Sequence, residues 1–165
     1  MGNASPLNGK VILAVDDEPD VLDTVVETLN MSEVHKAENF DTALDYLQNN
    51  SYDLVILDIM GVNGFELLKH SVARGFLTVM LTAHAVTMDA LRESEKRGAA
   101  AFLPKEYMGD LVEVLGDIVQ GKRTRFWWQK SIDRTRARSP RESESNWQEK
   151  DTFFHEFEES LKKKE

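Results

Sequence analysis

The feature that most constrains the fold is a series of short, unbroken apolar runs that repeats along the first 121 residues. The runs are Val11–Val15, Leu54–Leu57, Thr78–Leu81 and Ala100–Leu103, with a weaker one at Val34–Ala37. Strands that are apolar at every position, and not only at alternate positions, are typical of a parallel sheet that is buried on both faces. Each run therefore predicts one buried parallel strand.

Each run is followed by a segment whose apolar residues recur at helical spacing. The stripe after the first run is Val21, Leu22, Val25, Val26 and Leu29, and the stripe after the last run is Leu111, Val112, Leu115, Ile118 and Val119. Five strand–helix units of this kind predict a doubly wound α/β fold, with helices on both faces of one sheet. We interpret nearly all of these apolar residues as core.

Polar residues follow four of the runs, directly in three cases and after Pro104 in the case of Lys105. They are Asp16-Asp17-Glu18, Asp58, Thr82 and Lys105. The carboxyl ends of parallel strands meet at one edge of the sheet, so we expect these side chains to lie together. Carboxylates held close raise one another's pKa, and a hard divalent cation with oxygen ligands, Mg²⁺ above all, relieves that repulsion. With the charge of Lys105 and the hydroxyl of Thr82, the set predicts a site for a phosphoryl group beside a carboxylate.

The order and spacing of these residues resemble those of one known family. The segments VILAVDDEPD, DLVILDIMGVNG, VMLTA and GAAAFLPKE are similar to those of the CheY-like receiver domain of bacterial two-component response regulators, over about Lys10 to Gln120. The resemblance implies a five-stranded parallel sheet of order 2-1-3-4-5, the flavodoxin-like arrangement.

The resemblance also implies a reaction. Asp58 would be the phosphoacceptor, modified by a sensor histidine kinase or a phosphotransfer protein. Mg²⁺ would be bound by Asp17, by the Asp58 carboxylate and by the backbone carbonyl of Met60, with Asp16 assisting. Lys105 would pair with the Asp58 carboxylate and afterwards with the phosphoryl oxygens.

Two further residues would act as the switch that the resemblance implies. Thr82 would close on the phosphoryl group, and Phe102 would follow it inward. Catalysis would be limited to the protein's own phosphorylation and dephosphorylation, so we do not expect an enzyme with turnover. Hydrolases with an aspartate nucleophile are the other class we considered. They normally carry a second aspartate two residues after the nucleophile, where this chain has Met60.

The chain departs from the family pattern in three places. The loop after Asp58 reads IMGVNG, which is about two residues shorter than usual and lacks the usual proline. Lys105 is followed by Glu106 and not by proline, and Phe102 has no hydroxyl group to donate. None of these changes removes a reactive group.

Residues 122–165 lie outside the resemblance. The chain has a net charge of −9, yet residues 122–141 hold eight basic and one acidic side chain, against eight basic and twenty acidic in residues 1–121. This change in composition predicts a domain boundary near Gly121, with a receiver domain at 1–121 and a helical C-terminal extension at 122–165. The overall acidity argues against non-specific nucleic-acid binding by the whole chain.

Helical periodicity continues into this extension. From Asp110 the apolar residues run through Trp127, Trp128 and Ile132, which predicts one long fifth helix to about Arg138, before Pro140 breaks it. A second apolar seam then follows, made of Trp147, Phe154, Phe157 and Leu161.

The extension allows four interpretations. We favour an interface, in which its tryptophans and second seam hold a homodimer or a downstream protein, because exposed aromatic surface rarely persists in a monomer. They could instead cover the domain's own surface. A nucleic-acid-binding regulator could use the basic segment 122–138, with phosphate contacts from Arg123, Arg125, Arg134, Arg136 and Arg138. The same arginines could also dock on the acidic receiver.

The remaining features set limits on function. The chain has no cysteine and no run of about 18 apolar residues, so we expect a cytoplasmic protein without disulfides or membrane insertion. His84 lies two residues beyond Thr82, and we interpret it as an exposed loop residue. His35, His70 and His155 have no ligand spacing, so a zinc site is not supported.

Overall fold

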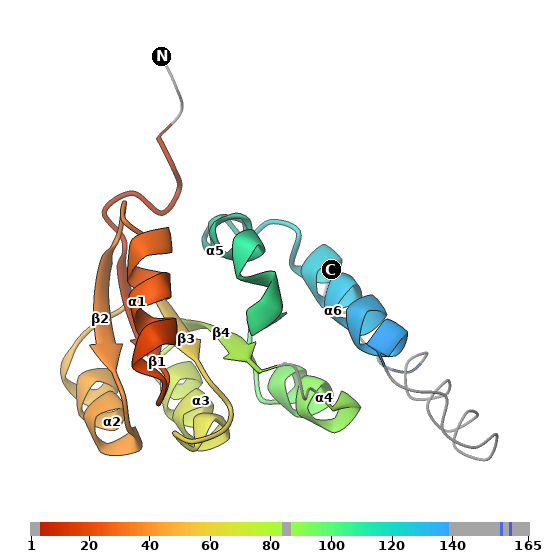
Figure 1. The fold of residues 1–165 in the computed structure, drawn as a ribbon, viewed down its shortest axis with the longest axis horizontal. Helices are drawn as coiled ribbons and strands as arrows, with labels where there is room; N and C mark the ends of the chain where they lie inside the picture. Colours follow the sequence, from red (N-terminus) through yellow and green to blue (C-terminus); the bar gives the residue numbers. More distant parts are fainter. Residues whose placement is uncertain (1–3, 84–86, 139–155, 157–158, 160–165) are drawn as a thin grey trace.

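The computed structural model describes residues 4–83, 87–138, 156 and 159. Five strands form one sheet: β1 (Val11–Val15), β2 (Glu33–Ala37), β3 (Leu54–Leu57), β4 (Leu77–Thr82) and β5 (Ala101–Pro104). All neighbouring strands are parallel and their order is β2-β1-β3-β4-β5 (Figure 1). The predicted sheet is therefore confirmed in number, direction and order.

Helices alternate with these strands. They are α1 (Pro19–Thr28), α2 (Phe40–Asn49), α3 (Gly64–Ala73), α4 (Met88–Lys96), the 3-10 helix η1 (Lys105–Asp110), α5 (Leu111–Val119) and α6 (Thr124–Arg138). The local sequence explains where two of these helices begin. Pro19 begins α1, where its missing N–H costs nothing, and the Asn39 side chain accepts a 2.9 Å hydrogen bond from the Thr42 N–H at the start of α2.

The sheet is buried between two layers of helices. One layer packs α2, α3 and α4 against side chains such as Leu13, Val55 and Met80. The other packs α1 and α5 against side chains such as Ile12 and Ile56 from the same strands. Successive residues of one strand therefore face different layers, which explains why the strands are apolar at every position.

The prediction of one long fifth helix is wrong. Helix α5 ends at Val119 and α6 begins at Thr124, so residues 120–123 form a corner between them. Gly121 and Arg123 have left-handed backbone conformations there, with φ of 69° and 57°. Two such residues cannot continue a right-handed helix. The chain therefore turns at this α5–α6 corner, and α6 returns along α5 (Figure 1).

The returning helix covers β5, the strand at one edge of the sheet. Trp127 belongs to the layer of α1 and α5, whereas Trp128 and Ile132 belong to the layer of α2, α3 and α4. Both tryptophans are only 2% exposed. The expectation that they form an exposed interface is wrong, because they complete the core of this chain. The second seam, Trp147 to Leu161, lies outside the described residues.

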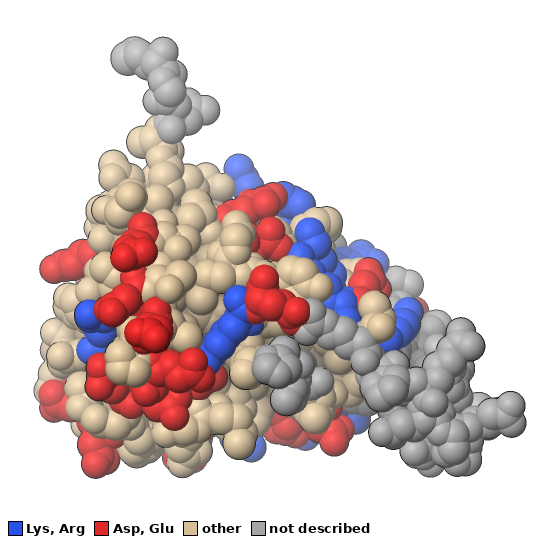
Figure 2. Space-filling view, in the orientation of Figure 1, with Lys and Arg blue, Asp and Glu red and all other residues tan. Residues whose placement is uncertain are grey.

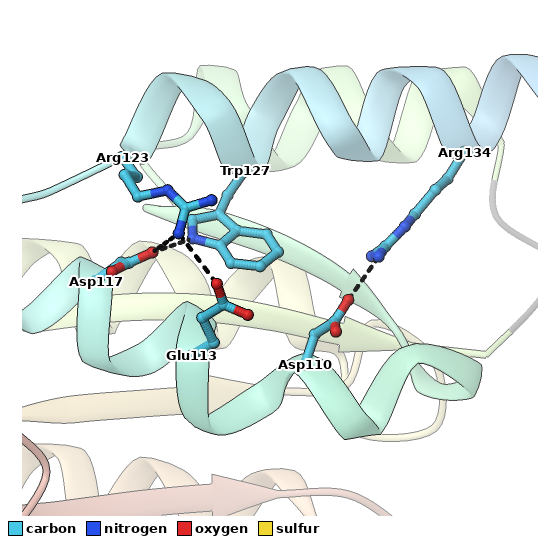
Figure 3. A network of polar contacts seen from close by, with 6 residues as sticks. All are labelled: Asp110, Glu113, Asp117, Arg123, Trp127 and Arg134. Carbon is cyan, nitrogen blue, oxygen red and sulfur yellow. Dashed lines mark hydrogen bonds and ion pairs between the residues drawn. The ribbon is translucent and has the colours of Figure 1, made fainter. Parts of the chain in front are cut away.

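Polar contacts hold α6 to the helices beneath it (Figure 3). The Trp127 indole N–H donates to Asp117 at 2.8 Å, and the Arg123 guanidinium lies 3.0 Å from Glu113 and 3.4 Å from Asp117. The idea that arginines of this block dock on the acidic receiver is thus confirmed for Arg123. A matching pair joins α6 to η1 further along.

That second pair is between Arg134 and Asp110. The two side chains are 2.5 Å apart, and the guanidinium lies 3.7 Å from the centre of the Tyr107 ring. Arg123 and Arg134, which could have contacted phosphates, are therefore bound within the chain. Basic side chains nevertheless form a row along α6, away from the acidic side chains gathered near α2 and the start of α1 (Figure 2). In the described part of the chain, no helix is both long and apolar enough to cross a bilayer.

Candidate functional site

The predicted polar residues all lie at the carboxyl ends of the strands. Asp16 follows β1, Asp58 follows β3, Thr82 is the last residue of β4, and Lys105 follows β5. Three of them are largely buried, with exposed fractions of 2% for Asp16, 4% for Asp58 and 6% for Thr82. We call these four residues, with Asp17 and Glu18, the strand-end cluster.

Lys105 is the positive charge of this cluster. Its Nζ lies 2.8 Å from Oδ2 of Asp16, 3.6 Å from Oδ1 of Asp58 and 3.7 Å from Oε1 of Glu18. The sequence predicted a pair between Lys105 and Asp58, and the structure adds Asp16 as the nearer partner. The backbone N–H of Glu18 donates to the other oxygen of Asp16 at 2.9 Å. One ammonium group is thus shared among three carboxylates.

The electrostatics of the cluster are unfavourable for its central carboxylate. Burial, together with the charges of Asp16 and Asp17, raises the pKa of Asp58 from its ordinary 3.8 to about 6, although Lys105 and a backbone hydrogen bond oppose the shift. Burial also raises the pKa of Asp16, against the opposing hydrogen bond from Lys105. The pKa of Lys105 is raised in spite of burial, because Asp16 and Asp58 stabilise its charged form. A cation bound here would relieve this repulsion.

Three carboxylates of the cluster could hold such a cation. Ligand oxygens of Asp16, Asp17 and Glu18 all lie within 4.8 Å of one another, with Asp17 and Glu18 exposed and Asp16 buried. Glu18 was expected at this edge of the sheet because it follows the two aspartates, but it was not predicted to be a metal ligand. Met60 is 75% exposed, and its thioether is a soft ligand that does not suit a hard cation, so only its backbone carbonyl has the right chemistry for the predicted ligand. Oxygen donors alone suit Mg²⁺.

Comparison with known proteins agrees with this arrangement. The family model described as the response regulator receiver domain matches residues 12–115, which is more than half of the chain. The chain belongs to the response regulator receiver family. The match ends within α5, so helix α6 of this receiver lies beyond it.

Curated relatives share the receiver part of their length. Response regulator Rre1 of Synechocystis is 35% identical over 113 residues, which cover 63% of this chain and 48% of that protein. The phosphate regulon transcriptional regulatory protein PhoB of Escherichia coli is 33% identical over 104 residues, which cover 58% of this chain and 45% of that protein. The chain thus spans less than half the length of either relative.

Solved receiver structures share the fold over nearly their whole length. A CheY-like receiver domain protein from Methanospirillum hungatei aligns with a TM-score of 0.58 at 26% identity, covering 69% of this chain and 98% of that one. Chemotaxis protein CheY4 from Vibrio cholerae aligns with a TM-score of 0.57 at 28% identity, covering 68% and 97%. These likenesses cover about two thirds of the chain.

Phe102, the expected switch residue of this receiver, lies in β5 and belongs to the same core cluster as Trp128 and Ile132 of α6. It is 2% exposed and pairs with Met80 of β4, while Pro104 of the same strand pairs with Thr82. Its backbone carbonyl accepts a 2.6 Å hydrogen bond from the Ser131 hydroxyl of α6. Strand β5 therefore contacts Thr82 at its carboxyl end and α6 at its centre.

The histidines stay outside this site where they are described. The His35 ring nitrogen lies 3.0 Å from the Tyr52 hydroxyl, and His70 lies 3.6 Å from Glu66 on the surface of α3. His84 and His155 lie outside the described residues.

Proposed function

We propose that this receiver domain is a phosphoacceptor, which takes a phosphoryl group onto Asp58 from a phosphohistidine of a sensor kinase or a phosphotransfer protein. The observation that carries the proposal is the Lys105 ammonium, which lies 2.8 Å from Asp16 and 3.6 Å from Asp58 among largely buried carboxylates. A fixed cation beside a buried carboxylate, with an acidic cation site next to it, is the arrangement that in-line phosphoryl transfer requires.

The chemistry follows from these groups. A carboxylate oxygen of Asp58 attacks the phosphorus, a P–O bond forms, and the P–N bond to the donor imidazole breaks. The electron pair of that bond stays on the imidazole, which leaves as a neutral ring when its other nitrogen already carries a proton. The Lys105 ammonium lies near enough to Asp58 to pair first with the carboxylate and then with the new phosphoryl oxygens. The Thr82 hydroxyl, at the end of β4, would then donate a hydrogen bond to one of these phosphoryl oxygens.

The donor set fits Mg²⁺, which we propose as the cofactor. Asp16, Asp17 and Asp58 would hold it together with the backbone carbonyl of Met60, and Glu18 is close enough to take part. When bound, Mg²⁺ would neutralise charge on the transferring phosphoryl oxygens. Within the chain, the carboxylates orient the cation and Lys105 supplies the charge that does not depend on it.

The output that we propose is a change in protein–protein contact. Added charge on Asp58 would bias the positions of Thr82 and Phe102, and through β5 it would act on the helix that covers this strand. A homodimer or a downstream protein would bind the C-terminal helices, and the seam from Trp147 to Leu161 would supply apolar contacts. Catalysis would remain limited to phosphorylation and dephosphorylation of Asp58 itself.

Intact-mass spectrometry of the full chain tests the proposal. With Mg²⁺ and acetyl phosphate as a small phosphodonor, the wild type should gain the mass of one phosphoryl group, and chelation of Mg²⁺ should abolish the gain. Asp58→Asn should gain nothing, whereas Asp45→Asn, which alters an exposed aspartate on α2, should react as the wild type does. Phosphorylation of the Asp58 variant, or none in the wild type, would contradict the proposal.

A further inference from the structure

The loop between β3 and α3 passes very close to the strand-end cluster at Gly61. A side-chain carbon at this position would lie 2.5 Å from Cγ and 2.9 Å from Oδ1 of Asp17, and nearer still to Oδ2. Real side-chain carbons essentially never approach other atoms closer than 3.0 Å. Because all three atoms of the carboxylate are this close, the whole group faces the backbone of Gly61. Only glycine fits here while Asp17 keeps its position.

The loop has little freedom to retreat from Asp17, because it is anchored on both sides of Gly61. The side chains of Ile59 and Val62 belong to the buried core. At the far end, the Gly64 N–H donates to the Ile59 carbonyl at 3.0 Å, and a side-chain carbon on Gly64 would overlap the carbonyl oxygen of Asp58. Gly64 is therefore pressed against the backbone of Asp58, which fixes the end of the loop.

Asp17 is the partner that can move. It is exposed, in contrast with the buried Asp16 beside it. A side chain added at Gly61 would push the Asp17 carboxylate out of the cluster at small cost to the fold. Such a change would separate the geometry of the acidic cluster from the stability of the domain.

We propose that Gly61 is a positioning residue, which leaves room for the Asp17 carboxylate beside the β3–α3 loop and thereby fixes it as a cation ligand. The inference rests on the proposed function, since it concerns the Mg²⁺ of that site. The shortened loop after Asp58 thus carries its own requirement, a glycine at its point of contact with Asp17.

A matched pair of variants tests this role. Gly61 and Gly75 both have left-handed backbones, with φ of 81° and 78°, but a side-chain carbon at Gly75 would meet no atom within 4 Å. Gly61→Ala and Gly75→Ala therefore add the same backbone strain, and only Gly61→Ala adds the collision. Binding of Mn²⁺ to the full chain, followed by the electron paramagnetic resonance signal of the free ion, reports the cation site without any phosphorylation. Asp17→Asn serves as the reference for loss of the ligand.

We expect Gly75→Ala to bind Mn²⁺ as the wild type does, and Gly61→Ala to bind it about 10- to 100-fold more weakly. In chelator, the two glycine variants should unfold at the same temperature. Equal Mn²⁺ affinity for both variants would overturn the inference. So would a much lower unfolding temperature for Gly61→Ala, because the loop and not Asp17 would then have absorbed the collision. A wild type that binds no Mn²⁺ would instead contradict the cation site of the proposed function, and this inference would fall with it.

Discussion

The strand-end cluster and helix α6 satisfy their charged groups in opposite ways. In the cluster, three carboxylates share one ammonium group, and burial raises the pKa of Asp58 to about 6. At α6, by contrast, Arg123 in the corner before the helix and Arg134 within it each pair with carboxylates of α5 and η1, and the Trp127 indole donates to Asp117. The first region holds charge at a cost in stability, whereas the second region stabilises the fold.

This difference separates chemistry from packing. Here the strand ends hold like charges together, and carboxylates with raised pKa values of this kind are typical of functional sites. The contacts of α6 instead complete an edge of the sheet that would otherwise present unpaired backbone groups of β5. If this comparison is right, substitutions in the two regions should change the free energy of unfolding with opposite signs.

The largest expected effect is on the α6 side. Trp128→Ala removes an almost fully buried side chain from the core and should lower the free energy of unfolding by about 3–5 kcal/mol. Phe126→Ala removes a neighbouring aromatic ring that is 42% exposed, and it should cost no more than about 1 kcal/mol. Urea denaturation of both variants gives the comparison. Equal stability of the Trp128 variant and the wild type would show that α6 does not belong to this core.

The opposite sign is expected at Asp58. Its folded-state pKa, raised from 3.8 to about 6, means that the folded protein loses stability as pH rises through this window, and the loss is complete above it. Asp58→Asn has no such loss, so at pH 7 in chelator it should be more stable than the wild type by about 1 to 3 kcal/mol. The difference should shrink toward pH 4. A variant less stable than the wild type at pH 7 would contradict the electrostatic account.

A smaller effect is expected where α6 meets β5. Ser131→Ala leaves the buried carbonyl of Phe102 without the hydroxyl that donates to it, which should cost about 1–2 kcal/mol. Ser94→Ala is the control, because that buried hydroxyl donates to the carbonyl of Ala90 one turn earlier in its own helix, and its loss should cost about 0.5 kcal/mol or less. Thermal unfolding of the two variants measures the difference. Equal losses would mean that the bond to β5 contributes nothing beyond a helix back-bond.

The smallest effect concerns the α5–α6 corner. Arg123 has a left-handed backbone with φ of 57°, which glycine adopts without strain. Arg123→Gly and Arg123→Ala both remove the half-exposed ion pairs with Glu113 and Asp117, so the difference between them isolates the backbone. The glycine variant should be more stable by about 1 kcal/mol, with little dependence on salt. An alanine variant of equal stability would indicate that this corner is not strained.

The same two regions show what a sequence can predict. The strand-end cluster could be found because each of its residues follows an unbroken apolar run, and parallel strands bring such positions to one edge. The pairing of Lys105 with Asp16 could not be predicted, because it depends on the distance between the ends of two strands, and the order of residues does not give that distance. Likewise, the sequence shows that the loop after Asp58 is short, but it does not show that Gly61 of this loop lies against Asp17.

Helix α6 was predicted as a helix but not in its place. Apolar residues continue at helical spacing through the corner, and periodicity alone cannot reveal a reversal of direction. The signal that could have found it is Gly121, the residue that most readily takes a left-handed conformation at the end of a helix. Trp127 and Trp128 face two different core layers. In the sequence, such an adjacent pair cannot be distinguished from a pair with one exposed ring, because the pattern does not show that α6 lies along the edge of a sheet.

The most direct test of the account is the pKa of Asp58 itself. Carbon-13 NMR of the full chain, labelled at the aspartate carboxyl carbons and titrated in chelator, follows each aspartate separately, and Asp58→Asn assigns the resonance. We expect a midpoint at about 6 for Asp58, well above the ordinary aspartate value of 3.8. A midpoint near that ordinary value would contradict the claim that the strand ends hold this carboxylate under repulsion beside Asp16.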